Sequence, residues 1–119
     1  MAIAVVTLTP MTFGWIISAT SADASGCEEL LAAPAAGVSI VLDEITINNG
    51  ANAISITIGE DAAAGAVGHA VIGPVAMAAN TSLQFMFPYG IMLKAAHSLT
   101  VDASGAGAIC IVARGRYTA

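Results

Sequence analysis

Apolar and polar residues alternate along much of this chain from residue 38 onward, and a period of two is typical of β-strands with one buried face. The alternating segments recur roughly every 8–12 residues, which predicts about eight strands. Seven of the expected strands cover 38–47, 54–58, 69–77, 83–87, 91–93, 99–101 and 108–117. This spacing predicts an all-β fold that is a sandwich, a jelly roll or a barrel, and of these we expect an antiparallel β-sandwich of the jelly-roll type.

Two local signals refine this expectation. The alternation changes phase at Asp43-Glu44, which predicts a bulge or bend there. Asn49-Gly50 follows the same strand, and Asn-Gly tolerates the positive φ of a tight turn. We therefore expect a β-hairpin that joins 38–47 to 54–58.

Other segments do not show this regular alternation. The Ala- and Gly-rich stretch 59–68 predicts an exposed loop, and Pro88-Tyr89-Gly90 predicts the end of the strand that contains Phe87. Glu28–Ala33 fits a short helix as well as a strand, because two glutamates favour a first helical turn but six residues are too few for a stable helix.

The composition indicates a part of a larger assembly. The chain has 119 residues, enough for one domain with its own core. Hydrophobic residues make up 57% and charged residues only 9%, whereas soluble domains carry about 25% charged residues. With so few charges, much of the surface must consist of Ala, Gly, Ser and Thr or be buried against other chains, and we expect both.

The charge balance excludes two classes of partner. The net charge is −5, and Lys94, Arg114 and Arg116 are the only cationic residues besides the histidines. Binding to nucleic acid or to an anionic membrane needs clustered Lys and Arg, so neither partner is expected.

The first nineteen residues carry no charge, yet they do not resemble a signal peptide or a membrane span. A basic segment is missing, and Pro10 and Gly14 interrupt the apolar run. We expect residues 1–22 to form an N-terminal arm or edge strands, followed by a β-sandwich domain over residues 23–119.

The titratable residues do not form a recognisable catalytic or metal-binding set. Carboxylates occur as adjacent pairs, which on a strand point to opposite faces, so we expect solvated surface charges. The pairs are Glu28-Glu29, Asp43-Glu44 and Glu60-Asp61. His69 and His97 lack further ligands at metal-binding spacing. His97 and Ser98 are consecutive, so an extended strand cannot give them the hydrogen bond of a Ser-His-Asp triad with Asp102. We expect no enzyme, no metal and no cofactor.

The two cysteines also lack a metal-binding spacing. Cys27 and Cys110 are far apart in the sequence, and free cysteines usually behave as small buried hydrophobic residues. A disulfide between them is the alternative.

Two groups of residues are candidates for an interface. Arg114 and Arg116 lie two apart on the last expected strand and hence on one face, where they could pair with an acidic neighbour or remain solvated. The uncharged N-terminal segment holds Met11, Phe13, Trp15 and Ile16. Aromatic residues and Met concentrate in interface cores, so these side chains either anchor in a neighbour's pocket or fill the domain's own core.

The order of strands and turns from Gly37 to the C-terminus resembles the capsid decoration (cement) proteins of tailed bacteriophages, which are small jelly-roll proteins. The segments that carry the resemblance are 37–58, 59–68, 72–75, 79–82, 85–93, 98–101, 105–107 and the final strand ending in Arg116-Tyr117. The resemblance implies a homotrimer on the exterior of an icosahedral virion that bridges neighbouring major capsid proteins. It also implies an N-terminal arm that reaches an adjacent subunit.

We therefore expect a virion structural protein whose partners are the major capsid protein and copies of itself. The first alternative is a receptor- or carbohydrate-binding β-sandwich module of a phage tail or fibre. An enzyme and a pilus-like subunit that exchanges its N-terminal strand are further alternatives.

Overall fold

The computed structural model describes residues 3–8, 14–21, 25–62, 67–105 and 107–118, and over these residues the chain forms nine β-strands. The strands are β1 (Ala4–Leu8), β2 (Gly14–Ser21), β3 (Ser25–Leu31), β4 (Ile40–Asn49), β5 (Ile54–Asp61), β6 (His69–Met77), β7 (Ser82–Met92), β8 (Ser98–Ser104) and β9 (Ile109–Tyr117). The predicted all-β class is confirmed, with one strand more than the eight expected.

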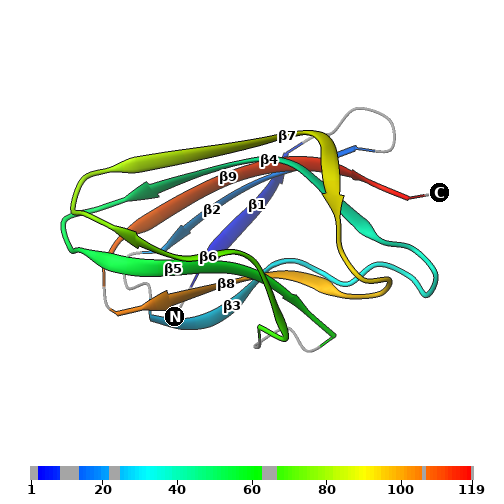
Figure 1. Cartoon of the computed structure of the whole chain (residues 1–119), viewed down its shortest axis with the longest axis horizontal. Coiled ribbons are helices and arrows are strands. Elements are labelled where there is room, and N and C mark those ends of the chain that lie inside the picture. The colour runs from blue at the N-terminus through cyan, green and yellow to red at the C-terminus, as the bar shows by residue number, and fades with distance from the viewer. Residues whose placement is uncertain (1–2, 9–13, 22–24, 63–66, 106, 119) are drawn as a thin grey trace.

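The strands form two antiparallel sheets packed face to face (Figure 1). The five-stranded sheet has the order β1-β2-β9-β4-β7, and the four-stranded sheet has the order β3-β8-β5-β6. Neighbouring strands within a sheet are mostly distant in sequence, so the connections repeatedly cross from one sheet to the other. This arrangement is a β-sandwich.

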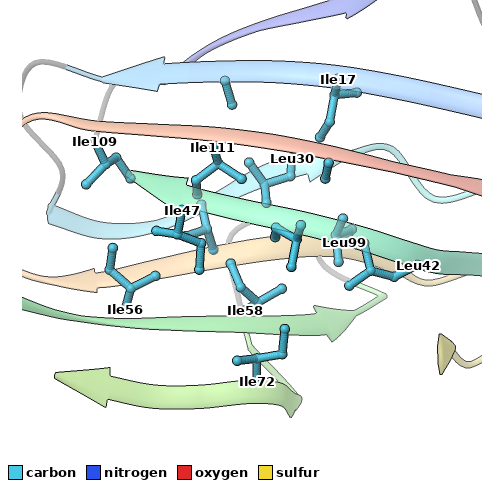
Figure 2. Packing of buried hydrophobic residues seen from close by; sticks show 14 of the residues in the cluster. Ile17, Leu30, Leu42, Ile47, Ile56, Ile58, Ile72, Leu99, Ile109 and Ile111 are labelled. Carbon is cyan, nitrogen blue, oxygen red and sulfur yellow. The ribbon is translucent and has the colours of Figure 1, made fainter. Parts of the chain in front are cut away.

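Aliphatic side chains from both sheets fill the space between them (Figure 2). Ile17, Ile47 and Ile111 come from the five-stranded sheet, and Ile58 and Leu99 come from the four-stranded sheet. All of these side chains are almost fully excluded from solvent. Isoleucine dominates because a β-branched side chain packs well on a pleated surface.

The period of two decides which face each residue occupies. One cross-strand row of the five-stranded sheet joins Ile17, Ala113, Ile45 and Phe85, and the adjacent row joins Ile16, Arg114, Glu44 and Met86. The first row is apolar and faces the core, whereas the second mixes ions with apolar groups and faces outward. The predicted alternation is therefore confirmed in the five-stranded sheet.

The predicted irregularity at Asp43 is also confirmed. The register of β4 against β9 shifts between Leu42 and Glu44, so Asp43 is an extra residue in β4. On the other side of β4, strand β7 has a longer irregularity. Its pairing with β4 runs from Ser82 to Met86 and resumes only at Ile91. We call the unpaired segment Phe87–Gly90 the β7 excursion. The prediction that this strand ends near Phe87 is wrong, since β7 regains its hydrogen bonds to β4 after the excursion.

The predicted hairpin at Asn49-Gly50 is wrong as well. β4 and β5 belong to different sheets, because both edges of β4 are already occupied by β7 and β9. The Asn49 N–H donates to the Thr81 carbonyl (2.8 Å) and the Gly50 N–H donates to the Ala108 carbonyl (2.8 Å). Gly50 has a φ outside the left-handed region, so a local turn signal here marks a crossing between sheets.

The N-terminal segment contributes strands to the five-stranded sheet. β1 lies at the edge, and β2 lies between β1 and β9, where its residue Ile17 is fully buried. Of the two alternatives for residues 1–22, the described residues therefore form sheet strands. Residues 25–31 form strand β3, which decides between helix and strand for most of Glu28–Ala33.

Candidate interaction surface

Arg114 and Arg116 point outward from β9 and pair with the two carboxylates at the β4 bulge. Arg114 Nε lies 2.9 Å from Glu44 Oε2, and Arg116 Nε lies 3.4 Å from Asp43 Oδ2. Consecutive residues of a regular strand would point to opposite faces. The bulge at Asp43 changes this, so both carboxylates reach arginines on the same face of the sheet.

Further hydrogen bonds connect this ion-pair group to β7. Gln84 Nε2 donates to Glu44 Oε1 (2.9 Å), and Arg116 Nη2 donates to the Tyr89 carbonyl (3.1 Å). The hydrogen bond from Gln84, together with the Arg114 guanidinium, lowers the pKa of Glu44 below its usual value. Glu44 is thus held ionised as an acceptor for both neighbours.

A hollow of about 410 Å³ lies beside these ion pairs. Its lining residues are Asp43, Met86, Phe87, Pro88, Arg114 and Arg116. Tyr89 is 92% exposed, Met92 67% and Met86 64%, and all three belong to β7. We call the lining residues together with Glu44, Tyr89 and Met92 the arginine surface.

Gly90 allows the β7 excursion to lie against the outer face of the sheet. Its φ is +76°, and a Cβ at this position would meet Val41, Asp43 Oδ1 and Arg116 Nη2. Only glycine combines this backbone conformation with so close an approach at low cost. The excursion therefore covers Val41 and presents Tyr89 next to the arginines.

Most residues of the arginine surface are of types common in protein interfaces. Arginine, tyrosine, phenylalanine and methionine are enriched in interface cores. Asp43 and Glu44 belong to the depleted types, but each is paired with an arginine. The formal charges of Arg114 and Arg116 are balanced by those of Asp43 and Glu44. A partner would thus meet an apolar surface whose charges are already paired, and its binding would not require a strongly charged counterpart.

The structure places the predicted N-terminal candidates differently from one another. Ile16 is the cross-strand partner of Arg114 and lies on the same outer face. Trp15 points inward and is buried, and its Nε1 donates to the Arg116 carbonyl (3.2 Å). A Cβ on Gly115 would overlap the Trp15 ring and the Val41 carbonyl oxygen, so Gly115 makes room for the indole. Met11 and Phe13 lie outside the described residues.

Three exposed residues of the arginine surface were missed by sequence reasoning. Met86 occupies an outward position of an alternating strand, and an apolar residue in that phase was the available signal. Tyr89 gave no such signal, because the sequence of 88–90 predicts a turn. Met92 gave none either, because all three residues of the expected strand 91–93 are apolar. Their exposure follows from the β7 excursion, which depends on the pairing of β7 with the bulged β4.

The expectation that Glu60 is a solvated surface charge is wrong. Glu60 is 8% exposed because it continues the inward-facing positions of Ile56 and Ile58 along β5. Its Oε2 accepts the Lys94 backbone N–H (2.8 Å).

Two histidines lie near the other oxygen of Glu60. Oε1 is 3.8 Å from His69 Nδ1 and 3.9 Å from His97 Nδ1.

The Ser98 hydroxyl has a carboxylate partner on a different strand, because Ser98 Oγ donates to Glu29 Oε2 (3.3 Å). Over the part of the chain that the structure describes, no three His, Cys, Asp or Glu side chains are placed to hold a metal ion.

The two cysteines are free thiols in different sheets, Cys27 on β3 and Cys110 on β9. Both are half-buried, so the expectation of two buried residues is wrong. Burial, and then the nearby Asp102 carboxylate, raise the pKa of the Cys27 thiol. A raised pKa keeps this thiol protonated and weakly nucleophilic.

No helix among the described residues is long and apolar enough to cross a membrane.

Comparison with known proteins does not place this chain in a family. No family model, no curated protein and no solved structure matches the chain.

Proposed function

We propose that this chain is a structural protein of a phage virion, which binds the outside of an icosahedral capsid and bridges neighbouring major capsid proteins. The single observation that carries the proposal is the arginine surface, where Tyr89, Met86 and Met92 are exposed beside two arginines with paired charges. A chain with 9% charged residues and such a surface suits burial against other proteins.

The order of the strands supports the jelly-roll part of this proposal. Placed one above the other, β2-β9-β4-β7 and β3-β8-β5-β6 put each strand opposite one of its sequence neighbours. Two Greek keys wound into one sandwich produce this interleaved order. In the proposed jelly roll, β1 is an additional strand beside the first sheet.

The proposed assembly is a homotrimer on the capsid exterior. Each copy would contribute one arginine surface, so a trimer would bind with three equivalent contacts. Individually weak contacts give strong attachment when they are linked in this way, because the second and third binding events are intramolecular.

Binding to capsid shells that lack this chain tests the proposal. We expect the purified protein to co-sediment with shells of the phage that encodes it and to raise their melting temperature. Tyr89→Ala should weaken binding by at least about tenfold, the effect of removing an interface anchor. Ala76→Ser changes an exposed residue of β6 in the other sheet and should bind as the unchanged protein does.

Two results would overturn the proposal. One is the absence of binding to the shells at saturating concentrations of the folded protein. The other is a Tyr89→Ala variant that keeps its melting temperature and binds the shells as tightly as the unchanged protein, which would remove the arginine surface from the contact.

One observation favours the carbohydrate-binding module as a second candidate. Tyr89 is 92% exposed and adjoins a hollow of about 410 Å³ lined by Asp43 and two arginines. An exposed aromatic ring beside hydrogen-bonding groups is a common way to hold a sugar ring. Binding on a glycan array that Tyr89→Ala abolishes would favour this candidate, and an empty array would remove it.

A further inference from the structure

The two sheets of the sandwich end in four edge strands among the residues described, namely β1 and β7 in one sheet and β3 and β6 in the other. Each edge strand leaves backbone N–H and C=O groups without a partner strand. Such groups form a template for another chain, so proteins protect their edges with proline, charges, bulges or short strands.

Three of the four edges carry such protection. β6 contains Pro74, which lacks a donor, and β7 contains Pro88 within its unpaired excursion. β3 carries Glu28 and Glu29, and its register shifts between Glu29 and Leu31. An incoming strand would meet a missing donor, a carboxylate or a break in spacing at each of these edges.

The fourth edge is different. β1 pairs with β2 over all five residues, Ala4–Leu8, without a shift in register. It contains no charged residue and no proline, and Val6 is 56% exposed. The free side of β1 thus offers regularly spaced backbone groups along an apolar strand.

We propose that β1 pairs with β1 of a second copy of this chain, antiparallel and about a two-fold axis at Val6, so that two five-stranded sheets join into one. Full overlap of two identical five-residue strands places Val6 opposite Val6, and Ala4 opposite Leu8. No like charges meet in this arrangement, because β1 carries no charged residue. If β3 of another copy paired with β1 instead, its two glutamates would be placed against an apolar strand. A two-fold contact uses the same surface on both copies and closes after two copies, so no unpaired β1 edge remains in the dimer.

This inference does not rest on the proposed capsid function. A two-fold β1 contact doubles whatever unit forms through other surfaces, whether that unit is one chain or a trimer.

The mass of the assembly in solution is the first test. Val6→Lys places a charge on each side of the two-fold axis, and we expect native mass spectrometry to show half the mass of the unchanged protein. Val112→Lys is the matched control, because Val112 is also exposed on this sheet but lies on β9, inside it. That variant should keep the full mass. Equal masses for the unchanged protein and Val6→Lys would overturn the proposal.

Disulfide trapping is the second test and does not depend on how Val6→Lys folds. In a background of Cys27→Ser and Cys110→Ser, Val6→Cys should form a covalent dimer under mild oxidation. Directly opposite residues have Cα atoms about 4.5–5.5 Å apart, within the range that a disulfide spans. Val5→Cys is the control, since two copies of Val5 would lie roughly 8 Å apart, beyond that range.

The trapping result decides the register as well as the contact. We expect covalent dimers with Val6→Cys at protein concentrations where Val5→Cys gives none. The proposal fails if Val6→Cys stays uncrosslinked, or if Val5→Cys crosslinks as readily.

Discussion

At the scale of single residues, the buried carboxylate of Glu60 connects strand β5 to the segment between β7 and β8. Its Oε2 accepts the backbone N–H of Lys94, and the side chain is almost fully buried. This hydrogen bond is partly buried and its acceptor is a carboxylate oxygen, and such a bond contributes about 1–3 kcal/mol to stability.

We therefore expect Glu60→Ala to lower the free energy of unfolding by about 1–3 kcal/mol. Glu60→Gln keeps an oxygen acceptor of the same length and should lose less. Urea denaturation of the two variants measures the difference. Equal losses would show that the hydrogen bond to Lys94 does not contribute to stability.

The ionised state of Glu44 predicts a pH dependence of stability. The hydrogen bond from Gln84 and the Arg114 guanidinium lower the pKa of Glu44 in the folded chain. A lowered folded pKa means that Glu44 contributes stability above its usual pKa of 4.5, and that this contribution disappears as the pH falls through the lower folded value. The unchanged protein should therefore lose an increment of stability in acid.

Glu44→Gln should lack this increment, so the melting temperatures of the two proteins should converge as the pH falls below the usual carboxyl pKa. The carboxyl resonance of Glu44, followed by NMR, gives its pKa directly. In Gln84→Ala that pKa should rise toward the ordinary value, and an unchanged pKa would rule out Gln84 as its main cause.

At the scale of the elements, the β7 excursion depends on one glycine. Gly90 has a left-handed φ of +76°, and a Cβ there would meet Val41, Asp43 and Arg116. Gly37 has a similar φ of +83°, but a Cβ there would find no heavy atom within 4 Å. Alanine substitutions at the two positions therefore separate the stability lost through the left-handed backbone conformation from the stability lost through steric contact of the added Cβ.

We expect Gly37→Ala to lower the free energy of unfolding by about 1–2 kcal/mol through backbone conformation alone. Gly90→Ala should cost more, since it also displaces the excursion from Val41. Denaturant titrations compare the two variants, and capsid or glycan binding reports on the displaced Tyr89. Equal costs would contradict the close packing of the excursion.

The sequence predicts elements better than it predicts their partners. Period-two alternation identifies most strands, and the phase change at Asp43 identifies the bulge, because both signals lie within one strand. The Asn49-Gly50 turn signal fails because the partner of a strand is decided by the whole sandwich, in which β7 and β9 flank β4. The arginine pair follows from spacing alone, whereas the exposure of Tyr89 needs the pairing of two distant strands and could not be read locally.

At the scale of the whole molecule, the two N-terminal strands differ in what they contribute to the fold. β2 supplies Trp15, Ile17 and Ala19 to the core, and each is almost fully buried. β1 contacts only β2 within its sheet, and its residues Val5 and Val6 are exposed. Buried apolar area is the main source of stability, so the loss of β1 should be tolerated and the loss of β2 should not.

Two truncations test this difference. A chain without residues 1–8 should keep a cooperative unfolding transition with a lower melting temperature, because β2 remains in place as a new edge strand. A chain without residues 1–21 loses the Trp15 side chain that packs over Gly115 and uncovers β9, and each large buried side chain removed costs about 2–5 kcal/mol. That total approaches the whole stability of a small domain, so we expect the second chain to be unfolded by circular dichroism. If the chain without residues 1–8 were also unfolded, β1 would be part of the folding unit, and the free edge proposed for pairing would be a stabilising element as well.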